Sequence, residues 1–267
     1  MRWDVITPRV IATDLDGTLL RTDSTLSART REALRKTRAA GMRVVAATAR
    51  PARVVEEIFG GDDLIDVAIC GNGSNLYEVG SHEPQVLHPL PIEVTRRVID
   101  EITAILPGSG FAVETGHRAL LEPGYSYQPT LDDRRILVGS IAELLNEPLV
   151  KLMVLLPDKD PDAAWERLRP TLGGLIECTW SAERAPLEIG AVGVSKAATL
   201  AALCAQWDVP AEDVIAFGDA PNDLPMLAWA GTAYAVANAH AAVLAATVLR
   251  APANDDDGVA QILETLA

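Results

Sequence analysis

The stretch Val10-Ile11-Ala12-Thr13-Asp14-Leu15-Asp16-Gly17-Thr18-Leu19 places two carboxylates directly after a run of uncharged, mostly apolar residues. Such a run predicts a buried parallel strand, and in open α/β sheets ligands bind beyond the carboxyl ends of the strands. Gly17 lets the chain turn sharply beside the aspartates. Two carboxylates so close together repel each other unless a cation lies between them. An ordinary acidic Asp-Gly turn has the same local sequence, so the rest of the chain has to distinguish the two interpretations.

Alternating strands and helices follow this stretch. A helix is expected at 28–40, between a possible N-cap at Ser27 and a stop at Gly41. An apolar strand at 43–47, a helix ending at Phe59 and a strand at 67–70 come next, and Leu76-Tyr77 predicts the start of a short hairpin. This order predicts a parallel sheet whose connecting loops gather at one edge.

The alternation is interrupted in the middle of the chain. Pro84, Pro89 and Pro91 are typical of a linker, and helices and strands in mixed order follow them. The alternation returns after Gly190. We therefore expect an α/β protein with a Rossmann-like parallel-sheet core, residues 1–83 and 188–267, that has helices on both faces. Residues 84–187 are expected to form an inserted α+β domain.

The composition is that of a globular chain, with 267 residues of which 49% are hydrophobic and 22% charged. The formal charge of −14 argues against nucleic acid and anionic membranes as partners, because neither is attracted to such a surface. Cys70, Cys178 and Cys204 form no CxxC pair and are expected to be reduced core residues of a cytoplasmic protein.

Two segments bear on a membrane location. Met1–Arg9 contains charges and no long apolar run, so a signal peptide is not expected. Residues 225–249 lack acidic and basic side chains and are long enough to cross a bilayer, but Gly231, Asn238 and His240 interrupt them. We expect a helix, a glycine stop, a strand, a turn and a helix inside a soluble domain, without a membrane partner.

Side chains that suit a cation or a phosphate follow other strands or begin a helix: Thr48, Lys196, Asp219, Asn222 and Asp223. Oxygen ligands of this kind suit Mg²⁺. With a lysine, a hydroxyl and backbone N–H groups, Mg²⁺ makes a cradle for phosphoryl oxygens, and an aspartate can attack phosphorus to form an acyl phosphate. Thr48 also fits as an N-cap of the helix that starts at Pro51.

Four stretches, in this order, resemble the four motifs of haloacid dehalogenase-like phosphatases: Asp14-Leu15-Asp16-Gly17-Thr18, Ala47-Thr48-Ala49-Arg50, Val194-Ser195-Lys196 and Gly218-Asp219-Ala220-Pro221-Asn222-Asp223. An insert between the second and third motifs is similar to the Cof-type branch, which has a large α/β cap domain. Asp256-Asp257-Gly258-Val259-Ala260 is similar to that branch as well. The resemblance covers nearly the whole chain, and the four motifs in order are specific.

The resemblance implies roles for individual residues. Asp14 would be the nucleophile, and Asp16 would protonate the leaving oxygen and then activate the water. Residues implied to bind the phosphate or the substrate are Leu15, Thr48, Ala49, Asn72, Gly73, Lys196 and Asn222. Residues implied to form the Mg²⁺ site are Asp14, Asp16 through its main-chain carbonyl, Asp219 and Asp223.

The expected function is therefore a Mg²⁺-dependent phosphatase that hydrolyses a small phosphorylated metabolite, such as a sugar phosphate, through an aspartyl phosphate. Two alternatives remain open at this point. One is a phosphotransferase or phosphomutase that uses the same intermediate, and the other is a protein that binds a phosphorylated metabolite without turnover. The sequence leaves the substrate undecided, as well as the choice between monomer and homodimer.

Overall fold

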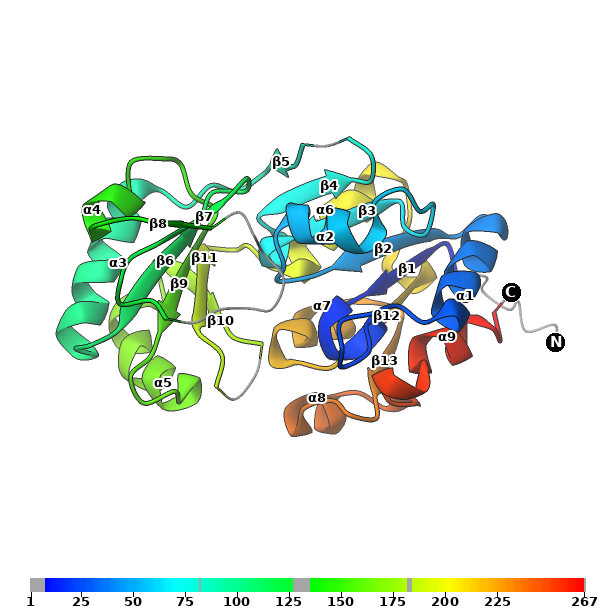
Figure 1. Ribbon diagram of the computed structural model, residues 1–267. Helices are drawn as coiled ribbons and strands as arrows, with labels where there is room; N and C mark the ends of the chain where they lie inside the picture. Colours follow the sequence, from blue (N-terminus) through cyan, green and yellow to red (C-terminus); the bar gives the residue numbers. More distant parts are fainter. Residues whose placement is uncertain (1–7, 82, 127–134, 182–183, 267) are drawn as a thin grey trace.

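The computed structural model describes residues 8–81, 83–126, 135–181 and 184–266, and the chain is built on two separate β-sheets (Figure 1). Each sheet has its own cluster of buried apolar side chains. The segment Met1–Arg9, for which no signal peptide is expected, lies mostly outside the described residues.

The first sheet has eight strands in the order β14-β13-β12-β1-β2-β3-β4-β5, and its neighbours are parallel from β14 to β3. The chain proceeds from β1 outward in one direction through β2 and β3, and from β12 outward in the other. The order therefore reverses between β1 and β12, which is where open α/β sheets bind ligands. The strands are β1 (Val10–Thr13), β2 (Arg43–Ala47), β3 (Val67–Cys70), β4 (Asn75–Glu78), β5 (Gln85–Val86), β12 (Val214–Gly218), β13 (Thr232–Val236) and β14 (Leu249–Ala251).

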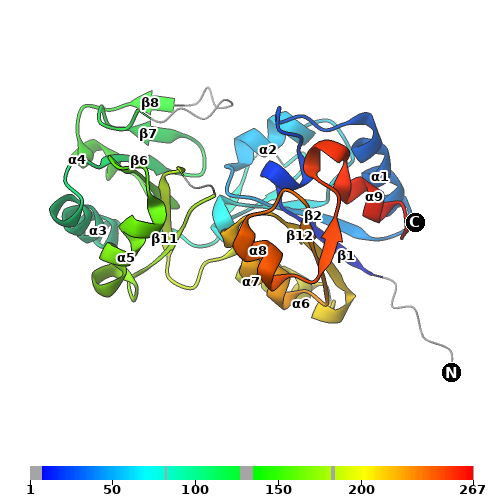
Figure 2. The same cartoon turned by 90° about the horizontal axis from the view of Figure 1, so that it is seen from below.

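Helices cover both faces of this sheet. Figure 2 shows α1 and α9 on one face and α6 and α7 on the other. The expected N-cap is present, because the Ser27 hydroxyl accepts a hydrogen bond from the backbone N–H of Thr30 at 3.0 Å. The helices are α1 (Ala28–Ala39), α2 (Ala52–Phe59), α6 (Lys196–Gln206), α7 (Leu224–Trp229), α8 (Ala241–Ala246) and α9 (Gly258–Leu263).

The second sheet is formed by the middle of the chain, in the order β10-β11-β9-β6-β7-β8. Helices α3 and α5 pack against each other, and Figure 1 shows them on the side of this sheet away from the first sheet. The elements are α3 (Ile92–Ile105), β6 (Gly110–Glu114), β7 (Ala119–Leu121), β8 (Arg135–Leu137), α4 (Ile141–Leu144), β9 (Lys151–Leu155), α5 (Pro161–Leu172), β10 (Ile176–Thr179) and β11 (Leu187–Ala191). The predicted fold class, a parallel-sheet core with an inserted α+β domain, is confirmed.

The expected limits of the insert are residues 84 and 187. The chain passes from the first sheet to the second, and back again, close to these positions but a few residues after each of them. Strand β5 pairs with β4 and so extends the first sheet to Val86. Strand β11 pairs with β9 and β10 and so belongs to the second sheet as far as Ala191. The difference arises because a short strand beside a linker carries no pattern that says which sheet it joins.

The apolar segment 225–249 contains α7, β13 and α8, as predicted, with Gly231 between the first helix and the strand. In the part of the chain that the structure describes, every helix is too short or too polar to span a bilayer.

The C-terminal Asp-Asp-Gly stretch is tied to the loop after the first motif. Arg21 donates to both carboxylate oxygens of Asp257, at 3.0 and 2.9 Å. The backbone N–H and the hydroxyl of Thr22 donate to Asp255, at 2.8 and 2.7 Å. These bonds fix residues 21 and 22, which follow the first motif, against the stretch that contains Asp255 and Asp257.

Candidate active site

Three carboxylates meet at the carboxyl ends of β1 and β12. These strands are paired from Val10 opposite Val214 to Thr13 opposite Phe217, so the residues that follow them emerge side by side. Asp14 and Asp223 are buried and Asp219 is partly buried. Each offers an oxygen atom, and these atoms all lie within 4.8 Å of one another.

Lys196 lies between two of these carboxylates. Its Nζ donates to Asp14 Oδ1 at 2.6 Å and to Asp223 Oδ1 at 2.7 Å, and the residue is 1% exposed. Lys196 is the first residue of α6, whose N-cap Ser195 accepts a hydrogen bond from the backbone of Ala198 at 3.1 Å. The helix start is therefore fixed, and the ammonium group is held inside the cluster.

Gly73 allows the loop after β3 to contact this helix start. Its φ is +111°, and a Cβ atom there would lie 2.5 Å from the carbonyl oxygen of Ser195. The carbonyl of Gly73 accepts a hydrogen bond from the hydroxyl of Thr199 at 2.8 Å. The expected substrate-facing residue Gly73 is thus a point of backbone contact with the helix that carries Lys196.

The carboxylates change one another's acidity. Burial raises the pKa of Asp14 well above its usual value, Asp223 and Asp219 raise it further, and Lys196 opposes the shift. Burial and the charge of Asp223 raise the pKa of Asp219 to about 6. The three acidic groups are thus compensated by one ammonium group only in part, and an additional cation would be attracted to the cluster.

The donor set fits a hard divalent cation. It consists of carboxylate oxygens alone, and among the described residues it is the one cluster of acidic or metal-ligating side chains that meets a metal-site geometry. Asp219 Oδ1 accepts a hydrogen bond from the Thr18 hydroxyl at 2.8 Å. Asp223 Oδ2 accepts from the backbone N–H groups of Asp219 and Ala220, both at 3.0 Å. Asp223 therefore also fixes the loop that carries Asp219.

Gly17 makes room for Asp219. Its φ is +76°, and a Cβ atom at this position would lie 2.6 Å from Asp219 Oδ2. The carbonyl of Gly17 accepts a hydrogen bond from Asn238 Nδ2 at 2.7 Å. The sharp turn expected at Gly17 therefore also brings the first motif against the fourth.

The side chain of Asp16 lies outside the three-carboxylate cluster. Arg50 donates to its two oxygens at 2.6 and 2.5 Å, and the Asp16 side chain is 47% exposed. Arg50 follows β2, so the second motif holds the expected acid and base at the rim of the site. Sequence reasoning assigned no role to Arg50.

Leu15 and Thr48 are buried at the ends of β1 and β2, and Ala49 beside Thr48 is partly buried. The Thr48 hydroxyl accepts a hydrogen bond from the backbone N–H of Arg50 at 3.1 Å. Helix α2 begins at Ala52 with Pro51 in the N-cap position, so the alternative in which Thr48 caps this helix is wrong. The hydroxyl instead orders the loop between strand and helix.

Asn72 and Asn222 connect the third and fourth strand-end loops. Asn222 Nδ2 donates to Asn72 Oδ1 at 3.2 Å. Asn72 Nδ2 donates in turn to two residues of the insert, Glu188 at 2.6 Å and Thr179 at 3.1 Å. The structure thus brings both asparagines together beside the cluster and joins them to the second sheet.

Three charged residues of the insert contact the core, and sequence reasoning missed all of them. Lys151 donates to the carbonyl of Ala49 at 2.8 Å and to Glu188 at 3.0 Å. Glu114 accepts two hydrogen bonds from Arg53 of α2, at 2.8 and 2.7 Å, and both side chains of this ion pair are 4% exposed. A single charge inside an otherwise apolar strand, as in Lys151-Leu-Met-Val-Leu, was the signal available in the sequence.

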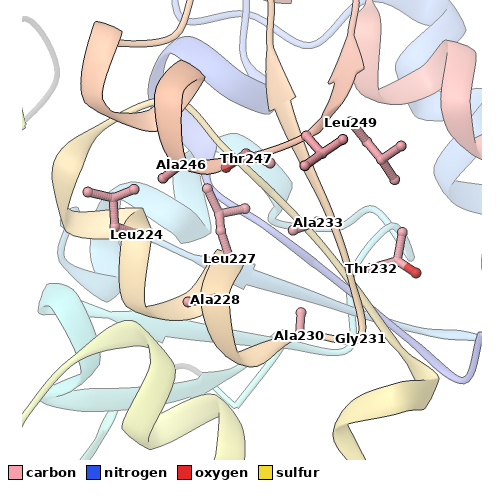
Figure 3. A pocket seen from close by; sticks show the side chains of 11 residues that line it. Leu224, Leu227, Ala228, Ala230, Gly231, Thr232, Ala233, Ala246, Thr247 and Leu249 are labelled. Carbon is pink, nitrogen blue, oxygen red and sulfur yellow. The ribbon is translucent and has the colours of Figure 1, made fainter.

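A cavity of about 290 Å³ lies elsewhere in the core domain, between α7, β13 and the start of β14 (Figure 3). Leu224, Leu227 and Thr232 are among its lining residues, and none of the lining residues is acidic or basic. The lining of this cavity therefore differs from the carboxylate cluster, in which three acidic side chains and a lysine meet.

Comparison with known proteins places this geometry in a family. Residues 11–263 match the model of the haloacid dehalogenase-like hydrolases. A pyridoxal phosphate phosphatase of Escherichia coli, YbhA, is 30% identical, with 97% of this chain and 98% of the relative covered. A 5-amino-6-(5-phospho-D-ribitylamino)uracil phosphatase of Bacillus subtilis, YitU, is 27% identical, with 96% and 97% covered.

Solved structures agree on the fold. A haloacid dehalogenase-like hydrolase from Bacteroides thetaiotaomicron is 25% identical, with a TM-score of 0.76 and with 97% of this chain and 100% of that chain covered. The protein SMU.1108c from Streptococcus mutans is 23% identical, with a TM-score of 0.83 and with 97% and 98% covered.

The chain belongs to the haloacid dehalogenase-like hydrolase family. The predicted membership in this family is thereby confirmed, as is the prediction of a phosphoric monoester hydrolase, because the curated relatives are phosphatases. The carboxylate cluster has the composition of a divalent metal site.

Proposed function

We propose that this chain is a Mg²⁺-dependent phosphatase that hydrolyses a small phosphorylated metabolite through an aspartyl phosphate on Asp14. The observation that carries the proposal is the position of Lys196 between Asp14 and Asp223, with Asp219 beside them. A buried carboxylate oriented by an ammonium group, next to a cluster that attracts a cation, is suited to attack a phosphoryl group.

The proposed reaction has two displacements at phosphorus. In the first, an oxygen of Asp14 bonds to phosphorus while the bond to the leaving oxygen breaks, and Asp16 gives that oxygen a proton. In the second, Asp16 takes a proton from water, the water oxygen bonds to phosphorus, and the Asp14 carboxylate is released. Arg50 holds Asp16 at the rim of the site, where the leaving group would lie.

The phosphoryl oxygens would be held by Lys196, by the Thr48 hydroxyl, and by the backbone near Leu15 and Ala49. Asp14, Asp219 and the main-chain carbonyl of Asp16 would hold Mg²⁺. Asp223 would complete the site and fixes the loop that carries Asp219, and Asn222 contacts Asn72 beside it. The ion would supply positive charge to the phosphoryl oxygens.

The substrate class and the cellular location belong to the same proposal. Two of the relatives are named for small phosphorylated metabolites, pyridoxal phosphate and a phosphoribitylamino-uracil. The net charge of −14 disfavours nucleic acid as substrate. The cysteines are free thiols, which suits the reducing cytoplasm.

The test is phosphate release from a panel of phosphorylated metabolites and from para-nitrophenyl phosphate. We expect turnover with added Mg²⁺ and loss of turnover with excess chelator, restored when Mg²⁺ is returned. Undiminished turnover in excess chelator would contradict the metal assignment. Absence of phosphate release from every ester, in folded protein with Mg²⁺ present, would contradict the proposed activity.

The cluster also predicts how stability depends on pH. Because the folded pKa of Asp219 is about 6, above the ordinary value of about 4 in an unfolded chain, the folded state retains a proton that the unfolded state has lost. This contribution to stability is present at low pH and is lost as the pH rises through about 6. Protons and Mg²⁺ compete for the same oxygens, so we expect Mg²⁺ to raise Tm more at about pH 7.5 than at about pH 5.

This dependence is measured by thermal unfolding with and without Mg²⁺ at both pH values. Asp219→Asn is the control, and we expect it to lose most of the Mg²⁺-dependent rise. An equal rise in Tm at both pH values for the unmodified protein would show that the cluster is not the site of competition.

A further inference from the structure

We propose that Glu188 and Lys151 form a subsite for the non-phosphate half of the substrate, and that Glu188 selects leaving groups with hydroxyl or N–H donors. This inference rests on the proposed phosphatase function and adds to it the chemistry of the leaving group. Both residues belong to the insert, Lys151 on β9 and Glu188 on β11.

The pair contacts two strand-end loops of the core, one that would hold the phosphoryl group and one beside the carboxylate cluster. Lys151 Nζ donates a hydrogen bond to the carbonyl of Ala49, the residue after Thr48. Glu188 Oε2 accepts a hydrogen bond from the Asn72 amide. The Asn72 amide oxygen accepts one from Asn222, the residue before Asp223. The strands of the core lie behind these loops and the insert in front of them, so we place the organic group of a bound ester on the side of the insert, where the pair lies.

Stability alone is a weak reason for this pair. Lys151 is 5% exposed and the Glu188 side chain 15%, and a buried ion pair is often no more stabilising than apolar side chains of similar size. The insert already has another buried ion pair with the core, Arg53 with Glu114. The presence of a second charged pair at this position is therefore better explained by binding than by stability.

The groups of the subsite that can still form hydrogen bonds are mainly acceptor oxygens. Glu188 accepts one bond at each oxygen from the described residues, from Lys151 and from Asn72, and a carboxylate has room for about four. Asn222 Oδ1 is buried and has no hydrogen-bond partner within the described part of the chain. These two acceptors lie on either side of Asn72, and Glu188 is the partly exposed one to which a leaving group with donors would bind.

The backbone of Asn72 supports a recognition role. Its φ is +57°, a left-handed conformation that asparagine adopts more often than most residues with a side chain. Gly71 and Gly73 on either side also have positive φ. In this conformation the Asn72 amide donates to Glu188 and to Thr179.

The test compares three esters: ribitol 5-phosphate, which carries hydroxyl donors, pyridoxamine phosphate, which carries N–H donors, and pentyl phosphate, which carries neither beyond its phosphate. We expect the unmodified protein to favour at least one donor-bearing ester over pentyl phosphate by about tenfold or more in kcat/KM. In Glu188→Gln, which keeps the shape but removes the charge, we expect this preference to fall by about tenfold, mainly through KM.

Glu114→Gln is the matched control, because Glu114 is a buried carboxylate that bonds across the same boundary between insert and core. We expect it to lower Tm and to change kcat/KM for the three esters by equal factors. Lys151→Met provides a second test, because Lys151 orients Glu188, and we expect it to reduce the same preference.

Three results would overturn the subsite. The unmodified protein could hydrolyse pentyl phosphate as well as both donor-bearing esters. Glu188→Gln could lower kcat/KM by the same factor for all three, as expected of a residue that only fastens the insert. Glu188→Gln could also leave the preference unchanged. In each case hydrolysis itself would still support the phosphatase function, which fails only if no ester is hydrolysed.

Discussion

Replacing Asp14 with asparagine is expected to lower kcat for phosphate release by at least about a thousandfold, because an amide does not attack phosphorus. The variant should remain folded. Lys196 keeps its bond to Asp223, and removing one of three mutually repelling carboxylates lowers the electrostatic cost of the metal-free site. Steady-state phosphate release and thermal unfolding, measured on the same preparation, test both statements.

The control for Asp14→Asn is Asp100→Asn, which makes the same chemical change at an exposed position of α3. It should leave kcat and Tm unchanged. If Asp14→Asn retained kcat within about tenfold of the unmodified protein, another group would be the nucleophile.

Replacing Lys196 with methionine is expected to have the largest effect on stability. It removes the ammonium group but leaves Asp14 and Asp223 buried, and a buried charge that loses its partner costs about 3–5 kcal/mol. The free energy of unfolding at neutral pH, measured by urea titration, should fall by about that amount, and phosphate release should be lost with it.

The destabilisation by Lys196→Met should depend on pH. Lys196 opposes the rise in the pKa of Asp14, so without it the folded state keeps the Asp14 proton to a higher pH. Protonation removes the unpaired charge, and the loss of stability should therefore be smaller at about pH 5 than at about pH 8. The double variant Asp14→Asn/Lys196→Met should recover part of the loss. A loss below about 1 kcal/mol at both pH values would contradict the arrangement.

That the site residues come together could be predicted from the sequence, because their meeting depends on the order of the strands. Asp14, Asp219 and Asp223 follow buried parallel strands, and parallel strands bring their carboxyl ends to one edge. Lys196 was found from its motif, but its position between two carboxylates depends on the contact of Gly73 with Ser195, which is a tertiary contact.

The boundary between insert and core could not be predicted in the same way. Glu114, Lys151 and Glu188 each occupy one position of a strand, and a charged residue in a strand is usually exposed to solvent. In the structure they lie where the insert meets the core: Glu114 pairs with Arg53 of α2, and Lys151 and Glu188 contact the strand-end loops. The structure also places β11 in the second sheet, whereas Leu187-Glu188-Ile189 as a sequence fits either sheet.

The position of the Asp16 carboxylate at the rim of the site also could not be predicted from the sequence. The motif places its backbone at the end of β1, but the direction of its carboxylate is set by Arg50, whose own position depends on the turn ordered by the Thr48 hydroxyl. Side-chain direction in a loop follows from such contacts more than from sequence spacing.

The central claim is that the phosphoryl group is transferred first to Asp14 and then to water. The stereochemical course at phosphorus tests it most directly. A phosphorothioate monoester made chiral with oxygen isotopes is hydrolysed in isotopically labelled water, and the configuration of the product is determined. Each in-line displacement inverts the configuration. Attack by Asp14 followed by attack of water therefore predicts overall retention. Inversion would show a single attack by water and would contradict a covalent intermediate on Asp14.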